Sequence, residues 1–152
     1  QRQIWRVSWY RPERGIRMIE YADLIGAPFK SHGRDIKTGV DCYGLVQEVF
    51  RREGIELPEF DADYNDCQKI NAIVRGEEER SSIWRRLEVP KVPCIVTISF
   101  GVARSVINHT GVYIGGNKFI HIRENIGVCV DDINSPAWRK IIHGYYEYIG
   151  KE

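Results

Sequence analysis

The spacing of apolar residues predicts a helix that begins near residue 42. Between residues 40 and 54, apolar side chains recur at the positions that fall on one helical face. These side chains are Cys42, Leu45, Val46, Val49 and Phe50. Asp41 is a residue type that caps helix N-termini, and Gly54 is one that ends helices. The pattern therefore places Cys42 in the first turn of a helix, on its inward face.

Other segments of the first half also show helical spacing. Met18, Tyr21, Ala22 and Ile25 predict a helix over residues 17–25, which the sequence Gly-Ala-Pro at 26–28 would end. Residues 67–87 are predicted to be mostly helical. The polar residues 30–39 are expected to form a loop, and residues 55–66 an irregular connection.

The second half of the chain is predicted to form strands. After Pro93, short segments rich in Ile, Val, Tyr and Phe alternate with turn residues such as Gly115, Gly116 and Asn117. The predicted strands are 95–100, 108–114, 118–122, 128–131 and 142–149. Helices followed by an antiparallel meander indicate a single α+β domain.

Composition adds little to this fold prediction but narrows the function. The 152 residues carry a formal net charge of +1, which gives no charge excess for binding nucleic acid. No segment approaches the roughly 18 consecutive apolar residues of a membrane span. Residues 1–17 contain five arginines and one glutamate, and the only methionine, Met18, follows them. We therefore expect a basic N-terminal arm or leader at 1–17 and a domain at 18–150.

Four cysteines raise the question of metal binding, disulfides or catalysis. They lie at positions 42, 67, 94 and 129, with no C-x-x-C motif and no paired Cys/His spacing, which argues against structural zinc. A domain of this size can build its core without disulfides, so thiols are expected. Cys67, Cys94 and Cys129 are predicted to be packing residues.

Cys42 is the candidate nucleophile. At a helix N-terminus, the helix dipole lowers the pKa of a thiol, and backbone N–H groups can stabilise an oxyanion. His109 and His121 lie on two predicted strands joined around Gly115 and Gly116, where residues whose numbers sum to 230 or 231 would face each other. His109 could then act as the base and His121 could orient it. The alternative is a buried structural cysteine with two structural histidines.

Three ordered motifs resemble the NlpC/P60 family of papain-like cysteine peptidases. They are residues 39–46 around Cys42, residues 109–115 from His109, and Phe119-Ile120-His121. The similarity extends from about Met18 to Tyr146. It implies a papain-like α+β domain, with N-terminal helices packed on an antiparallel β-sheet. It also implies Cys42 as nucleophile, His109 as base and His121 as third polar residue, with no metal or organic cofactor.

The resemblance also suggests residues that contact the substrate. Asp41 is retained at a position that the family uses near the free amine of the substrate. Phe29 stands where tyrosine is common, and Tyr43 replaces the usual serine after the nucleophile. His32 could border the active cleft. Asp41, Tyr43, Phe29 and His32 are therefore the predicted substrate-binding residues.

The implied activity is hydrolysis of peptidoglycan stem peptides at the bond between D-glutamate and the diamino acid. Residues 26–29, 32–35 and 132–139 are most similar to the cell-wall peptidases of phage and prophage tails, so phage tail proteins are a further candidate partner. We expect a cell-wall-directed protein that binds no nucleic acid. Two alternatives remain open: a non-catalytic cell-wall-binding or phage tail component, and a papain-like acyltransferase.

Overall fold

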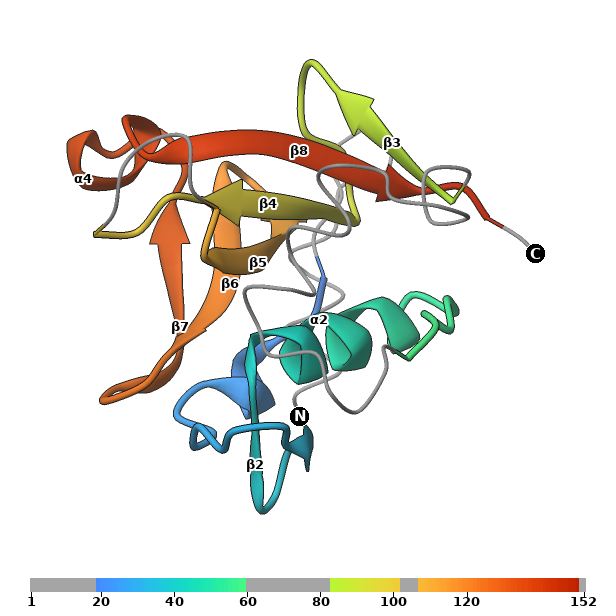
Figure 1. The fold of residues 1–152 in the computed structure, drawn as a ribbon, viewed down its shortest axis with the longest axis vertical. Coiled ribbons are helices and arrows are strands. Elements are labelled where there is room, and N and C mark those ends of the chain that lie inside the picture. Colours follow the sequence, from blue (N-terminus) through green and yellow to red (C-terminus); the bar gives the residue numbers. More distant parts are fainter. Residues whose placement is uncertain (1–18, 60–82, 102–106, 151–152) are drawn as a thin grey trace.

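A six-stranded antiparallel sheet organises the structure. The computed structural model describes residues 19–59, 83–101 and 107–150; the predicted arm at 1–17 lies outside them. The strands are β3 (Trp84–Leu87), β4 (Cys94–Ile98), β5 (His109–Gly115), β6 (Lys118–Arg123), β7 (Gly127–Asp132) and β8 (Ile142–Tyr148). They lie in the order β3-β8-β4-β5-β6-β7 (Figure 1). The five predicted strands are thus confirmed, with small shifts at their ends.

The order of the strands corrects two predictions. The meander holds only from β4 to β7, because β8 pairs with both β3 and β4. Residues 84–87 form a strand where a helix was predicted, and Trp84 pairs with Tyr148. The Trp84 ring packs edge-on against Phe50 and Tyr148, so contacts distant in sequence override the helical pattern. The rest of that predicted helix, 67–82, lies outside the described residues.

The predicted helix after Asp41 is confirmed as α2 (Cys42–Arg51). The Asp41 carboxylate accepts a hydrogen bond of 2.7 Å from the Gly44 N–H, as an N-cap does. Gly54 has a φ of +80°, the left-handed conformation that favours glycine after a helix. The apolar face of α2 shares a core with residues of β4, β5 and β6, among them Ile95, Val112 and Ile120. Figure 1 shows α2 alongside the sheet, with β2 close to its first turn.

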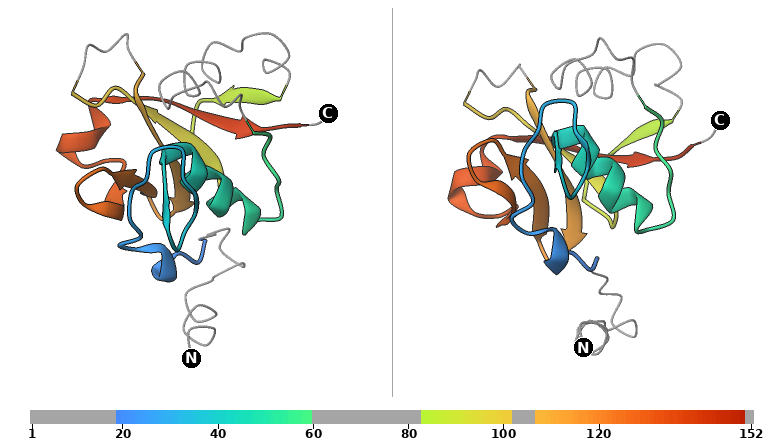
Figure 2. Two further views of the ribbon diagram at one scale, coloured as in Figure 1. Left: turned by 60° about the horizontal axis from the view of Figure 1, so that its bottom comes forward. Right: turned by 90° about the horizontal axis from the view of Figure 1, so that it is seen from below.

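A second hydrophobic cluster is formed by alternate residues of the strands. It contains Val96, Ile98 and Phe119, together with Ile133 and Trp138. Trp138 belongs to the short helix α4 (Pro136–Arg139), which lies at one end of β8 in all the views (Figures 1 and 2). The sheet therefore buries apolar side chains on both of its faces. Neither α2 nor α4, the α-helices of the described ranges, is long and apolar enough to cross a membrane.

The helix predicted at 17–25 is wrong in its described part. Only a 3-10 turn, η2 (Ala22–Leu24), forms there. The Ile19 N–H donates to the oxygen of Ile114, and the Gly26 N–H donates to that of Val128, so the segment is held by the sheet. The helical spacing placed Ile25 on the inward face and Leu24 off it. In the structure Leu24 is completely buried, whereas Ile25 is 48% exposed.

A small hairpin replaces part of the predicted polar loop. It consists of β1 (Arg34–Asp35) and β2 (Gly39–Val40). The hairpin touches the start of α2, because the Gly33 oxygen accepts the Asp41 N–H at 3.3 Å. The position of the Cys42 backbone is therefore fixed by the cap and by this hairpin together.

Candidate active site

A cavity of about 540 Å³ brings Cys42 and His109 together. Cys42 is the first residue of α2 and His109 is the first residue of β5. Phe29 and Phe100 contribute rings to the lining, and Arg123 contributes a charged group from the end of β6. The structure thus places the predicted nucleophile and the predicted base in one cavity, along with the predicted substrate residue Phe29.

His109 and His121 are hydrogen-bonded neighbours, as predicted. His109 Nε2 lies 2.9 Å from His121 Nδ1, and both side chains are buried. The register differs from the prediction, because His121 pairs with Gly111, so that facing residue numbers sum to 232. The turn is formed by Gly116 and Asn117, which both have positive φ, and a bulge precedes it. His109 lies two residues before Gly111 on β5, so its side chain contacts His121 diagonally across the two strands.

Gly111 leaves the space between the two histidines open. A Cβ atom at this position would lie 2.6 Å from the Ile120 oxygen and 3.0 Å from the His121 Cβ. Neither atom could move away without moving β6. A glycine directly opposite His121 thus allows the close approach of the strands that the His109–His121 contact uses.

Asp131 extends this pair into a chain of three groups. Its Oδ2 lies 2.8 Å from His121 Nε2. A carboxylate can only accept, so His121 donates from Nε2 and accepts at Nδ1 the proton that His109 carries on Nε2. His109 Nδ1 is then the nitrogen without a proton. This chain of hydrogen bonds therefore selects the tautomer in which His109 can accept a proton on Nδ1, the ring nitrogen that does not contact His121.

Aromatic rings enclose the two imidazoles. The Phe119 ring stacks on His121 with centroids 4.6 Å apart, and the Trp138 ring meets His121 edge-on at 4.8 Å. Phe100 lies 5.7 Å from His109. Burial lowers the pKa of His109 to about 3, with a further lowering by the charges of His121 and Arg123. Burial also lowers the pKa of His121, although Asp131 opposes this shift. Both rings are therefore neutral at neutral pH.

The pKa of His109 predicts acid sensitivity. An unfolded chain binds a proton on this imidazole near pH 6.5, whereas the folded protein resists protonation down to about pH 3. The unfolded state therefore binds more protons in this window, and the free energy of unfolding falls as pH decreases from 6.5 towards 3. Denaturant titrations at several pH values, with EDTA present, should show a shallower decrease for His109→Gln. Equal slopes in the two proteins would refute the prediction.

Asp41 lies in an ion-pair network beside the nucleophile. Its completely buried Oδ1 accepts from Arg34 Nη1 at 2.7 Å as well as from Gly44. Arg34 also makes two hydrogen bonds of 2.9 Å to the Glu59 carboxylate. Asp41 is not among the residues that line the Cys42 cavity. The structure thus shows a capping role for Asp41, and the substrate-binding role stays a prediction.

The other two predicted substrate residues also lie apart from the lining of this cavity. His32 is exposed, has a φ of +61°, and its Nδ1 lies 3.1 Å from the Ser31 hydroxyl. Tyr43 is completely buried in the core, and its hydroxyl donates to the Pro58 oxygen at 2.6 Å. The Arg34 guanidinium lies 5.7 Å from the centre of the Tyr43 ring. Tyr43 therefore ties the segment after α2 to the helix.

This hydrogen bond predicts a structural effect for Tyr43→Phe. The Pro58 oxygen would lose its partner, while the packing of the ring would remain, so the free energy of unfolding should fall by about 1 kcal/mol. Urea denaturation of both proteins measures the change. Because the hydroxyl points to the main chain after α2, hydrolysis should stay within about twofold of wild type; a larger loss of activity would indicate that Tyr43 contacts substrate.

Sequence reasoning missed Asp131 and the aromatic residues around the histidines. Cys129 pairs with His121 across β6 and β7, and Asp131 lies two residues further along the same strand. Residues two apart on a strand share a face, so the alternation in 127–132 was the signal that could have identified Asp131. No comparable pattern identified Trp138. The sequence does not define the direction of the turn before α4, and so it does not show where this ring lies.

The described cysteines carry thiols. Cys42 and Cys94 are buried, and Cys129 is half-buried. Cys129 was expected to be a packing residue, yet its Sγ lies 3.6 Å from His121 Nε2. The potential ligand atoms of His121, Cys129 and Asp131 all lie within 4.8 Å of one another. These three residues are therefore the group in the described parts that could hold a metal ion.

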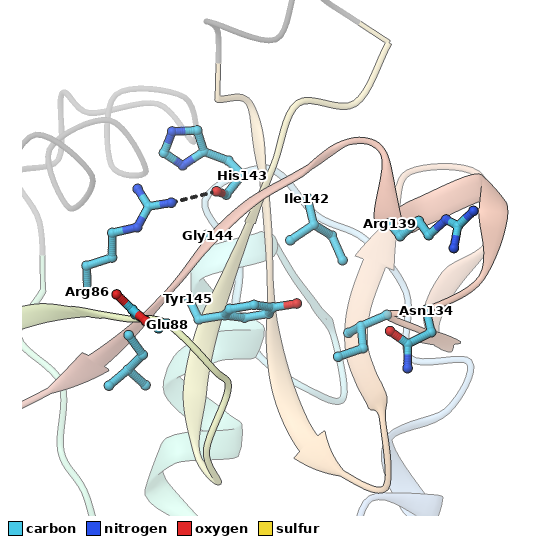
Figure 3. A pocket seen from close by; sticks show the side chains of 10 residues that line it. Arg86, Glu88, Asn134, Arg139, Ile142, His143, Gly144 and Tyr145 are labelled. Carbon is cyan, nitrogen blue, oxygen red and sulfur yellow. Dashed lines mark hydrogen bonds between the residues drawn. The ribbon is translucent and has the colours of Figure 1, made fainter.

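A second cavity, of about 690 Å³, lies beside β3 and β8. Figure 3 shows the Arg86 guanidinium directed at the main-chain oxygen of His143, with Tyr145 and Arg139 also around the cavity. Its described lining contains a histidine but no cysteine. Of these two cavities, only the one at Cys42 therefore combines a thiol with an imidazole.

Comparison with known proteins relates the chain to one family. Residues 26–81 match the profile of the NlpC/P60 family. The murein DD-endopeptidase MepS/murein LD-carboxypeptidase of Escherichia coli strain K12 is 32% identical over 124 residues, which cover 81% of this chain and 56% of that protein. The bifunctional muramidase/DL-endopeptidase CwlT of Bacillus subtilis strain 168 is 26% identical over 124 residues, 80% of this chain and 32% of the relative. The chain thus spans about half, or less, of these relatives.

The fold is also shared with solved structures. An NlpC/P60 family protein from Bacillus cereus superposes with a TM-score of 0.57 at 20% identity, covering 93% of this chain and 44% of the other. At this identity the likeness shows the fold alone. The profile match, the relatives and the shared fold all support an NlpC/P60 family domain with the papain-like fold.

Proposed function

We propose that this domain is a cysteine peptidase that hydrolyses amide bonds in peptidoglycan stem peptides. The observation that carries the proposal is the cavity shared by Cys42 and His109, with His109 held by His121 and Asp131. The proposal is supported by the murein endopeptidases among the relatives. The association with a phage tail remains a prediction from the sequence.

The geometry suggests the order of the chemical steps. His109 takes the thiol proton of Cys42 on Nδ1, and the thiolate attacks the amide carbonyl. The first turn of α2 offers backbone N–H groups and the positive end of the helix to the developing oxyanion. The imidazolium is stabilised through His121 by the negative charge of Asp131, and it then protonates the leaving amine. Water completes hydrolysis of the thioester, with His109 again as base.

We further propose that the bond cleaved joins the side-chain carboxyl of D-glutamate to the diamino acid. The test is incubation of the protein with purified peptidoglycan, followed by mass spectrometry of the released fragments. The expected products are a D-glutamate with a free side-chain carboxyl and a diamino acid with a free amine. Cleavage of the cross-link instead would overturn the choice of bond and leave the peptidase class standing. Binding without any fragment would overturn the peptidase itself.

Asp131→Asn tests the tautomer chain. A neutral amide no longer requires a proton on His121 Nε2, so the tautomer with an unprotonated His109 Nδ1 loses its preference. With EDTA present, kcat should fall by about 10-fold or more, while KM changes little. The ¹⁵N chemical shifts of the two imidazoles report the tautomers directly. An unchanged kcat with shifted ¹⁵N signals would show that the tautomer does not limit the rate.

A further inference from the structure

We propose that His121, Cys129 and Asp131 form a binding site for a divalent transition-metal ion such as Zn²⁺, and that its occupation switches the peptidase off. The inhibitory part rests on the proposed function, whereas the binding part does not. The site is adjacent to the catalytic pair but includes a thiol, Cys129, for which the peptide-hydrolysis mechanism has no use.

The three potential ligand atoms all lie within 4.8 Å of one another, and two of their separations can be compared with those that a tetrahedral ion requires. Zinc lies about 2.0–2.3 Å from nitrogen, oxygen and sulfur ligands, so its ligands are about 3.3–3.7 Å apart. The His121 Nε2 to Cys129 Sγ distance of 3.6 Å falls in this range. Asp131 Oδ2, now 2.8 Å from His121 Nε2, would need to lie about half an ångström further from this nitrogen. Imidazole, thiolate and carboxylate together are a donor set that zinc favours.

The surroundings both hold the ring and leave a path for the ion. The His121 ring is fixed by Phe119 and Trp138, and its Nδ1 is bound to His109. A ligand whose second nitrogen is hydrogen-bonded is the common arrangement in metal sites. The Asp131 side chain is 35% exposed, so an ion can enter from solvent on that side. A water molecule would complete four-coordination, because three ligands come from the protein.

Metal binding would reverse the tautomers of both histidines. An ion on His121 Nε2 displaces the proton there, so His121 must carry its proton on Nδ1 and donate it to His109 Nε2. His109 must then hold its own proton on Nδ1, and this nitrogen can no longer accept the proton of Cys42. Both imidazoles stay neutral, because the proton that His121 loses from Nε2 is balanced by the proton that His109 gains on Nδ1. One proton is released overall, from the Cys129 thiol.

The binding test uses Zn²⁺ and Co²⁺ with the full chain, and it needs no substrate. One equivalent of Zn²⁺ should bind, and Co²⁺ should give a thiolate charge-transfer band. Cys129→Ser should remove the band and weaken binding by about 100-fold or more, and Asp131→Ala should weaken it by at least about 10-fold. Cys42→Ala should keep both the band and the stoichiometry. Loss of binding in Cys42→Ala, or its retention in Cys129→Ser, would overturn the site, because the ion would then sit on Cys42 and His109. Absence of binding by the wild type would overturn it as well.

Activity on peptidoglycan provides the second arm. Zinc should inhibit the wild type, and EDTA should restore its activity. Cys129→Ser should hydrolyse as fast as the metal-free wild type and should not be inhibited by the same zinc concentration. Inhibition of both proteins alike would refute the switch. If the metal-free wild type releases no fragments, the proposed function fails, and the binding titration still decides whether the metal site exists. Circular dichroism of each variant confirms that it is folded.

Discussion

Cys42→Ala is expected to abolish release of stem-peptide fragments, with a fall in kcat of at least about 10⁴-fold. Among the described residues no other thiol lines the cavity with His109, so neither Cys94 nor Cys129 can replace Cys42 in forming the thioester. His109→Gln should lower kcat by about 10²- to 10⁴-fold, because the thiol loses its proton acceptor. Fragment release is measured by chromatography of the soluble products, and alkylation by iodoacetamide reports the reactivity of Cys42 independently of substrate.

Cys94→Ala is the matched control. Cys94 is buried like Cys42, but it lies on β4 opposite Tyr113 and outside the Cys42 cavity. Burial raises the pKa of its thiol to about 12, so this sulfur is protonated and unreactive at neutral pH. The Cys94 variant should remain active. Residual hydrolysis at the wild-type rate in Cys42→Ala would exclude covalent catalysis by Cys42.

Gly44→Ala is expected to lower the free energy of unfolding by about 2 kcal/mol. A Cβ atom at residue 44 would lie 2.3 Å from the Gly33 oxygen and 3.2 Å from the Val40 Cβ. The Gly33 oxygen is main chain, so relief requires the hairpin before α2 to move. Alanine favours a helix interior by about 1 kcal/mol over glycine, which offsets only part of this cost. Thermal and urea denaturation measure the difference.

Gly150→Ala is the control for that substitution. A Cβ atom at residue 150 would meet nothing within 4 Å, so stability should be unchanged. Because Gly44 donates to the Asp41 carboxylate, the displaced hairpin should also disturb the N-cap and reduce activity. A Gly44→Ala protein as stable as wild type would show that the hairpin adapts without cost.

Local signals were sufficient where the partners of a residue are close in sequence. The Asp41 cap and the periodicity from Cys42 to Phe50 predicted α2, and the turn at Gly116 predicted the pairing of β5 with β6. The neighbouring positions of His109 and His121 followed from these two elements. Much of the candidate site, although not its roles, was therefore foreseeable from the sequence.

Partners distant in sequence account for the failures. Ile19 and Gly26 bind main-chain atoms of Ile114 and Val128, about 100 residues later, and no local pattern contains that information. Trp84 lies in a strand because Tyr148 pairs with it. The register at His121 was missed because the bulge before the turn depends on which residues form the two-residue loop. Asp131 was missed for a related reason, since its place beside His121 depends on the pairing of β6 with β7.

The position of β8 has a consequence for folding during translation. β8 separates β3 from β4, yet it follows β7 in the sequence. When the ribosome has made β4 to β7, those four strands can form a meander, but β3 has no hydrogen-bonding partner and one edge of β4 stays open. Cooperative closure of the sheet must wait for Ile142–Tyr148 to emerge. Contacts of such long sequence separation slow folding, so the nascent domain would present an exposed strand edge that chaperones can recognise.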